Sequence, residues 1–191
     1  FNFLMKADNL SFGEALRKLA QQAGIEIHSK SEPSKHGYLY RINEEATLFF
    51  QRRLASPHGD AARDYLEQRG LTPESIERFR LGLSPSDGES LMNYLTAEGF
   101  TLEQLATSGV ITTGQYGRSR DLLNNRLVFP IADTRNRVAG FAGRIMDDTN
   151  PKYLNSPTTP IFNKGRLLYG FNIAKDSMKE RGAVLVEGYM D

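Results

Sequence analysis

The hydrophobic period of the chain changes near Val110, and this change constrains the fold more than any other feature of the 191 residues. Before it, apolar residues recur every three or four positions, as in helices with one buried face. After it, short runs rich in valine, phenylalanine and isoleucine alternate with polar turns, which is typical of β-strands. We therefore expect an α+β fold with a helical N-terminal part and a mixed, largely antiparallel sheet that carries a basic face.

The helical part contains clear signals for where helices begin. Ser11 and Glu14 have the spacing of a capping box, and so do Thr101 and Gln104. Thr72 is followed by proline, which combines an N-cap residue with the favoured first helical position. Helices are expected over residues 11–23, 38–54, 61–69, 73–80, 91–98, 101–106 and 171–181, with a short polar linker at 32–37.

Strand patterns fill most of the second part of the chain. Strands are expected over residues 110–112, 115–117, 126–133 and 137–146, and a buried strand over 183–187. Pro130 cannot donate a backbone hydrogen bond, so the strand that contains it must lie at an edge or carry a bulge at that point.

Composition excludes several classes of protein. The sequence has no cysteine, which excludes disulfides and thiolate zinc sites within it, and its three histidines are not at metal-ligand spacing. It has no apolar run of about 20 residues and no signal-peptide pattern at its start, so we expect a cytoplasmic protein without a membrane contact. The absence of an initiator Met and the apolar run that leads into the last residue indicate that both ends are cut.

Positive charge is concentrated in the middle of the chain. Residues 1–117 have a small acidic excess, whereas residues 118–166 carry nine basic and four acidic side chains. The basic residues of this region are Arg118, Arg120, Arg126, Arg135, Arg137, Arg144, Lys152, Lys164 and Arg166. Such a concentration is typical of a surface that binds a polyanion.

Strand geometry and an aromatic residue extend this interpretation. Side chains on a strand alternate between its faces, so Arg135 and Arg137 are expected on the same face. Tyr153, beside Lys152, is available for stacking against a base. A basic face with a stacking residue suits a nucleic acid that is bound without reading its sequence. A solvated charged face is the alternative, and charge alone does not decide between the two.

The end of the chain carries two carboxylates in a suggestive position. The apolar residues 184–186 lead into Glu187, a glycine follows, and Asp191 comes four positions after the glutamate. Ligands of α/β sheets bind at the carboxyl ends of strands. Glu187 and Asp191 are therefore candidate catalytic residues and candidate metal ligands, for a divalent cation or for proton transfer. A glutamate at a strand end can equally be an ordinary loop carboxylate.

Five ordered motifs resemble one known family. They are Asn125-Arg126-Leu127-Val128-Phe129-Pro130-Ile131, Gly140-Phe141-Ala142-Gly143-Arg144, Pro151-Lys152-Tyr153-Leu154-Asn155-Ser156-Pro157, Lys164-Gly165-Arg166-Leu167-Leu168-Tyr169-Gly170 and Val186-Glu187-Gly188-Tyr189-Met190-Asp191. The sequence looks like the bacterial DnaG-type DNA primases in all five. Ala62-Arg63-Asp64-Tyr65-Leu66, Arg69-Gly70-Leu71 and Phe79-Arg80-Leu81-Gly82 are similar to the helical entry of the same family.

The resemblance implies an organisation into three parts. Residues 1–35 correspond to a helix and linker that follow a zinc-binding domain, and the zinc ligands themselves are absent. Residues 36–169 correspond to the N-terminal subdomain of the catalytic core. Residues 170–191 correspond to the start of a Toprim module, which would be truncated and would contribute its first helix and strand.

The resemblance also implies roles for individual residues. Side chains expected to line a groove for template, RNA:DNA hybrid or incoming nucleotide are Arg126, Arg144, Lys152, Tyr153, Lys164 and Arg166. Glu187 matches the Toprim glutamate and Asp191 the acidic residue after it. The other ligands for Mg²⁺ or Mn²⁺ would lie downstream, so we expect these residues to bind nucleic acid without synthesising primers.

The implied activity is the synthesis of short RNA primers on single-stranded DNA for replication. Its partners would be the template, the hybrid, nucleoside triphosphates and a replicative helicase, the last through a C-terminal domain not in this sequence, and the protein would be a monomer. Two other interpretations stay open. The chain could come from another Toprim protein, such as a phage primase-helicase or a topoisomerase-like enzyme, or it could be a non-catalytic nucleic-acid-binding module.

Overall fold

The computed structural model describes residues 5, 15, 18–20, 35–114, 117–147 and 151–190. The chain divides into two compact units, Phe1–Lys35 and His36–Asp191. In the first unit, residues 5, 15 and 18–20 are helical, and the alanines at 15 and 20 are buried. The capping box predicted at Ser11 and Glu14 and the first half of the predicted linker, residues 32–34, lie outside the described residues.

The second unit begins with a long helix, α3 (Gly37–Ala55), which has the predicted amphipathic spacing. Its apolar stripe of Leu39, Ile42, Ala46 and Phe50 is fully or almost fully buried. The shorter helices that follow are η1 (Pro57–Gly59), α4 (Asp60–Gln68), α5 (Pro73–Arg78), α6 (Ser90–Ala97) and α7 (Leu102–Ser108). Within the described part of the chain, no helix is both long and apolar enough to cross a membrane.

The two caps predicted within this unit are confirmed. The Thr72 hydroxyl accepts a hydrogen bond of 3.2 Å from the backbone N–H of Ser75 at the start of α5. At the start of α7, the Thr101 hydroxyl accepts from the Gln104 N–H at 3.3 Å, and the Gln104 side chain accepts from the Thr101 N–H at 2.9 Å. These bonds satisfy backbone donors that have no partner within the helix.

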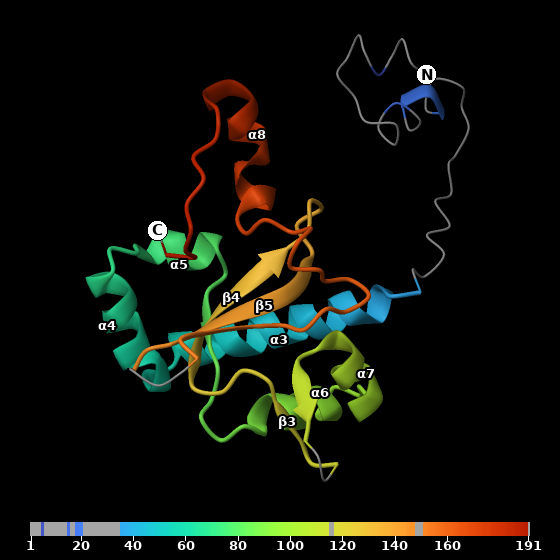
Figure 1. Cartoon of the computed structure of the whole chain (residues 1–191), viewed down its shortest axis with the longest axis vertical. Coiled ribbons are helices and arrows are strands. Elements are labelled where there is room, and N and C mark those ends of the chain that lie inside the picture. The colour runs from blue at the N-terminus through green and yellow to red at the C-terminus, as the bar shows by residue number, and fades with distance from the viewer. Residues whose placement is uncertain are drawn as a thin grey trace. The chain divides into compact units, whose positions relative to one another are not determined.

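The sheet is antiparallel at every described pairing. Figure 1 shows its two long strands, β4 and β5. Four strands lie in the order β1 (Gly82–Leu83), β4 (Arg126–Ala132), β5 (Val138–Ile145) and β6 (Tyr153–Asn155), and β2 (Ile111–Thr113) pairs separately with β3 (Ser119–Asp121). Of the strand predicted at 115–117, only Gly117 is described; it has a φ of 74° and belongs to the turn before β3, and the other two residues lie outside the described ranges. The α+β class is confirmed.

The prediction made from Pro130 is also confirmed. Phe141, its partner on β5, exchanges hydrogen bonds with Ser156 on its other side, so the nitrogen of Pro130 faces away from β5. On that open side, β1 pairs only with Leu127 and Val128. A register shift follows at Ile131/Ala132. The missing N–H of the proline therefore costs the sheet no hydrogen bond.

Two buried clusters cover the two faces of the long strands. The Phe141 cluster includes Phe50, Leu95 and Val128. The Phe129 cluster includes Leu127 and Phe162. Val128 and its neighbours alternate between the clusters as the two-residue period of a strand requires. Both β4 and β5 are buried along almost their whole length. The basic side chains of these two strands, Arg126 and Arg144, lie near the end of the sheet at which β4 begins and β5 ends.

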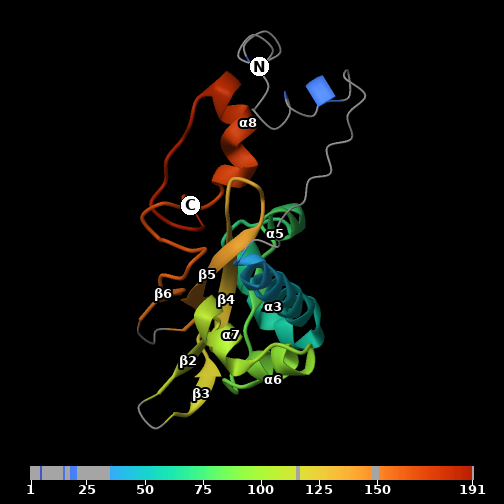
Figure 2. The ribbon, with the colours of Figure 1, turned by 90° about the vertical axis from the view of Figure 1, so that its right-hand side faces the viewer.

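The last part of the chain is only partly as predicted. Helix α8 (Phe171–Arg181) has the predicted bounds. The buried strand predicted at 183–187 was wrong: the segment has no regular secondary structure, and Val184 is 92% exposed. A strand needs a neighbour for its backbone hydrogen bonds, and the described residues place none beside this segment. From the end of α8 the chain turns back and runs alongside that helix (Figures 1 and 2).

Candidate nucleic-acid interface

Arg144 is the centre of a polar network at the sheet edge. It pairs with Tyr153 across β5 and β6, and its side chain is buried. Its Nε donates to the Tyr65 hydroxyl at 3.2 Å, and its Nη1 donates to the Tyr153 hydroxyl. Burial lowers the pKa of Arg144, but the hydrogen bonds with Tyr153 and Tyr65 outweigh it and hold the pKa above its ordinary value. The cation thus fixes the aromatic ring predicted to stack on a base.

The network continues onto α4 through a residue that the sequence analysis did not assign to the interface. The guanidinium carbon of Arg69 lies 5.4 Å from the ring centroid of Tyr65, the same tyrosine that Arg144 contacts. Arg69 itself is exposed. The signal in the sequence was its place in a motif similar to the primase entry segment, four residues after Tyr65, a spacing that puts both residues on one face of a helix. Only the tertiary structure brings Tyr65 to Arg144.

Tyr153 also contacts a second tyrosine. Its ring centroid lies 5.8 Å from that of Tyr189, which stacks on Phe129 at 5.4 Å. The Tyr189 hydroxyl donates to Asn155 Oδ1 at 2.9 Å. Burial raises the pKa of Tyr189, and the nearby Tyr153 adds to this effect, so the hydroxyl remains a donor at neutral pH. Tyr153 is half-buried, and both Arg144 and Tyr189 contact its ring.

Arg126 lies in a different environment from the one predicted. It is 7% exposed, and its Nη1 donates to the backbone carbonyls of Pro151 at 2.9 Å and Lys152 at 3.3 Å. Burial lowers the pKa of Arg126, although an arginine in this setting keeps its charge at neutral pH. The structure therefore directs this guanidinium toward the protein backbone.

The remaining predicted cations are exposed. Lys152 is at the entry to β6, and Lys164 and Arg166 lie in the loop between Phe162 and α8. Among the described residues, no ion pair engages any of the three. Because Phe162 and Leu167 pack in the Phe129 cluster, this loop lies on the same side of the sheet as Tyr65 and Tyr189. The loop with Lys164 and Arg166 therefore lies on the side of the sheet where Tyr153 contacts Tyr189.

The prediction for Arg135 and Arg137 was wrong in its geometry. Both lie in the turn before β5, which begins at Val138, so the strand period does not apply to them. Arg137 pairs with Asp133 at 2.7 Å, and its guanidinium carbon lies 3.8 Å from the ring centroid of Tyr40. Arg137 therefore stabilises the turn, while Arg135 is exposed.

Glu187 is exposed. Together with Lys164 it lines a cavity of about 590 Å³ between α8 and the segment that follows it. Asp191 lies outside the described residues. No group of three histidine or acidic side chains that could hold a metal occurs in the described ranges.

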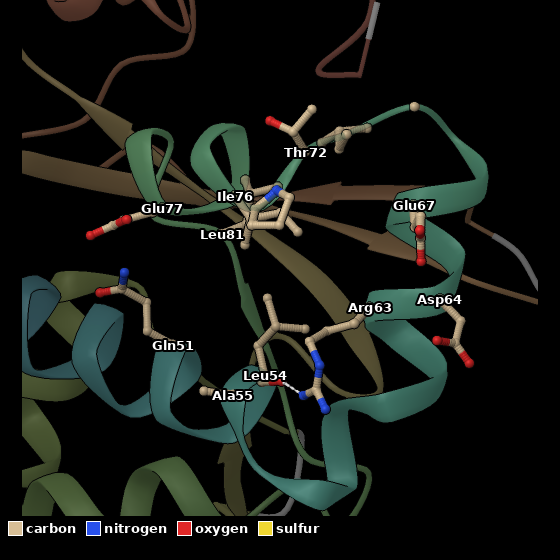
Figure 3. Close-up of a pocket in the computed structure, with 13 residues that line it drawn as sticks. Gln51, Leu54, Ala55, Arg63, Asp64, Glu67, Thr72, Ile76, Glu77 and Leu81 are labelled. Atoms are coloured by element: carbon tan, nitrogen blue, oxygen red, sulfur yellow. Dashed lines mark hydrogen bonds between the residues drawn. The ribbon is translucent and has the colours of Figure 1, made fainter.

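A second cavity, of about 760 Å³, lies between α3, α4 and α5 (Figure 3). Aliphatic side chains, among them Leu54, Ile76 and Leu81, line it, whereas Asp64, Glu67 and Glu77 stand around it. The cation at this cavity, Arg63, already bonds with Asp60 and with backbone carbonyls. Such a surface repels a polyanion, so we exclude it from the nucleic-acid interface.

Comparison with known proteins identifies the family. Residues 49–175 match the family model of the DNA primase catalytic core, N-terminal domain. The DNA primase of Deinococcus radiodurans is 42% identical over 193 residues, which is 100% of this chain and 33% of that protein. The chain spans about a third of the length of the curated relatives that it matches.

Solved structures give the same result. A DnaG primase catalytic domain bound to single-stranded DNA is 42% identical, with a TM-score of 0.71 over 80% of this chain and 49% of that one. The Aquifex aeolicus primase, containing zinc-binding and RNA polymerase domains, is 34% identical, with a TM-score of 0.74 over 99% of this chain and 46% of that one. This chain belongs to the family of the N-terminal domain of the DNA primase catalytic core.

Proposed function

We propose that this chain is the template-binding part of a DNA primase, which synthesises short RNA primers on single-stranded DNA for replication. The observation that carries the proposal is the pairing of Arg144 with Tyr153 across β5 and β6, with the exposed Lys152 beside them. A fixed aromatic ring among cations suits single-stranded nucleic acid, which is bound through stacking and phosphate contacts. The relative bound to single-stranded DNA adds support.

In the proposed reaction, a primer 3′ hydroxyl attacks the α-phosphate of a nucleoside triphosphate, and pyrophosphate leaves. The contribution of this chain is to hold the template and the RNA:DNA hybrid. Phosphates would be neutralised by Lys152, Lys164 and Arg166, and Tyr153 would stack on a base. Arg69 would add one more cation to this surface. Glu187 and Asp191 are proposed as acidic residues of the catalytic centre.

Other functions are assigned to parts of the protein outside these residues. Since the chain spans about a third of its relatives, we assign the remaining ligands for Mg²⁺ or Mn²⁺, the Zn²⁺-binding domain and the helicase contact to those parts. Residues 1–35 would be the helix and linker after the zinc domain, 36–169 the N-terminal subdomain, and 170–191 the start of the Toprim module. The protein would act as a monomer in the cytoplasm.

Binding of labelled single-stranded DNA, followed by fluorescence anisotropy at several salt concentrations, tests the proposal. Lys152→Ala, Lys164→Ala and Arg166→Ala should each reduce the slope of log K against log salt by about 0.7, the value for one phosphate contact on a single strand. Arg41→Ala is the matched control, because Arg41 is exposed on α3 beside Phe100 in the opposite, Phe141 cluster. Equal slopes for all four variants would contradict the proposal.

We further propose that these 191 residues do not synthesise primers by themselves. The test is to incubate the chain with single-stranded template, Mg²⁺ and nucleoside triphosphates and to look for short RNA. Recovery of template-dependent RNA would overturn this part of the proposal.

A non-catalytic binding role is the second candidate, favoured by the exposure of Glu187 and the lack of a carboxylate cluster among the described residues. Lys152→Ala and Lys164→Ala in the full-length protein separate the two. Loss of DNA binding with unchanged synthesis at saturating template would favour mere binding, whereas slower synthesis at saturating template would favour a role in the catalytic core.

A further inference from the structure

We propose that Arg126 is a positioning residue: it holds the backbone that presents Lys152 to nucleic acid and does not itself contact the ligand. This inference rests on the proposed function, because it concerns how the same interface is built. Arg126 and Lys152 are both cations of one basic region in the sequence, but the structure gives them opposite surroundings. Lys152 is exposed, whereas Arg126 is buried.

The backbone of Arg126 is fixed at the beginning of β4. The hydroxyl of Ser84, which is itself buried, accepts from the Arg126 N–H at 2.9 Å. In return, the Ser84 N–H donates to the Arg126 carbonyl at 2.9 Å. These two bonds tie Arg126 to the end of β1, so its side chain starts from a defined point.

The side chain then crosses β5 at a glycine. A Cβ atom on Gly143 would lie 2.9 Å from Cδ of Arg126 and 2.8 Å from Cδ2 of Leu123. Both separations are shorter than van der Waals contact allows, so only glycine leaves this path open. Gly143 pairs with Val128 on β4 and with Leu154 on β6, which places the crossing between the fixed backbone and the loop before β6.

The guanidinium ends on that loop. Its Nη1 is shared between the carbonyls of Pro151 and Lys152. The Lys152 carbonyl also accepts from the Ile145 N–H at 3.1 Å, so two donors from two strands converge on the backbone of one residue. The planar arginine fork suits this arrangement, whereas a lysine ammonium is a compact point charge on a flexible stem. A lysine at position 126 would therefore keep the positive charge but would not hold the backbone of Pro151 and Lys152.

The experiment is a double-mutant cycle in the full 191-residue chain, with labelled oligothymidylate as the probe. We compare Lys152→Ala, Arg126→Lys and the double variant by anisotropy at 0.1 M salt. Loss of one phosphate contact corresponds to about a fivefold loss of affinity at this salt concentration. If Arg126 acts through Lys152, each single variant loses about fivefold, and the double variant loses no more than Lys152→Ala alone.

Lys164 provides the matched control, because it lies in a different loop that Arg126 does not contact. The losses of Arg126→Lys and Lys164→Ala should multiply to about 25-fold if each contact is independent. The proposal is overturned if Arg126→Lys binds as the unmodified chain does, since charge alone would then suffice. It is also overturned if its loss multiplies with that of Lys152→Ala.

Amide hydrogen exchange, measured by NMR, tests the same proposal without DNA. The Ile145 N–H should exchange faster in Arg126→Lys, while the Phe141 N–H, which donates to Ser156, stays protected. Gly143→Ala displaces the Arg126 side chain without changing residue 126, so the Ile145 N–H should exchange faster in this variant too. Unchanged exchange of Ile145 in both variants would overturn the proposal. A lack of DNA binding by the unmodified chain would instead refute the proposed function.

Discussion

The guanidinium carbon of Arg144 lies 5.1 Å from the ring centroid of Tyr153, and the same arginine donates a hydrogen bond to the hydroxyl of that tyrosine. One cation therefore fixes both the face and the edge of the aromatic ring. The second bond of Arg144, to Tyr65, ties the edge of the sheet to α4. The interface is thus held together by side chains from three elements, of which α4 is distant in sequence from β5 and β6.

The tyrosine hydroxyls around Arg144 should stabilise the fold cooperatively. Tyr153→Phe and Tyr65→Phe each remove one acceptor from a buried guanidinium, and each should lower the free energy of unfolding by about 1 kcal/mol. The double variant should lose more than the sum, because it removes both hydroxyl acceptors. Urea denaturation followed by circular dichroism measures the effect, with Tyr38→Phe as control. Strict additivity would contradict this prediction.

The turn at Asp133 should make stability depend on acidity. The carboxylate accepts from the backbone N–H groups of Arg135 and Arg137 at 2.9 and 3.0 Å and from the Arg137 guanidinium. Burial raises the pKa of Asp133, but these hydrogen bonds and the Arg137 charge outweigh it and hold the pKa below its ordinary value. The carboxylate therefore contributes stability above the unfolded-state pKa, about 3.9, and loses that contribution as pH falls through the lower folded-state value.

Asp133→Asn should accordingly be less stable than the unmodified chain at pH 7, by about 1 kcal/mol. The difference should shrink as the pH is lowered below about 4. Denaturation curves at pH 7, 5, 4 and 3 give the comparison, and Asp64→Asn, at an exposed position, should show no such trend. A difference that stays constant with pH would show that the charge of Asp133 is not its source.

Gly140 should tolerate no side chain. A Cβ atom there would lie 2.7 Å from the ring of Phe162, which is 2% exposed and has no room to move. Gly140→Ala should lower the free energy of unfolding by about 1–3 kcal/mol, as overpacking of a core does. Gly165→Ala is the matched control, since its nearest neighbour would be an asparagine oxygen at 3.4 Å. Thermal unfolding of the two variants should therefore differ clearly, and equal melting temperatures would refute the prediction.

Tyr189 should anchor the segment that follows α8. Its ring packs against Phe129 and Tyr169, with centroids 5.4 and 5.0 Å away, while Val184 and Leu185 are exposed. Tyr189→Ala should increase the rate of thermolysin cleavage within 183–188 several-fold, because cleavage follows the population of the released segment. Lys179→Ala, an exposed change on α8, should leave the rate unaltered. If thermolysin cleaves both variants at the same rate, Tyr189 does not anchor this segment.

The sequence by itself determined the elements that depend on near neighbours. The spacing of Ile42, Ala46 and Phe50 predicted α3, and the hydroxyls of Thr72 and Thr101 predicted where α5 and α7 begin. The missing N–H of Pro130 predicted an open side of β4. Each of these features depends on chemistry within a few residues, which the order of amino acids contains directly.

Only the tertiary structure decided which of the similar cations are free. Arg126, Arg144 and Lys152 are equivalent as charges in the sequence, but two are buried against partners and one is exposed. The partner Tyr65 lies 79 positions from Arg144. The segment at 183–187 has the residues of a strand without a strand beside it. Burial and strand pairing depend on residues distant in sequence, so local pattern cannot determine them.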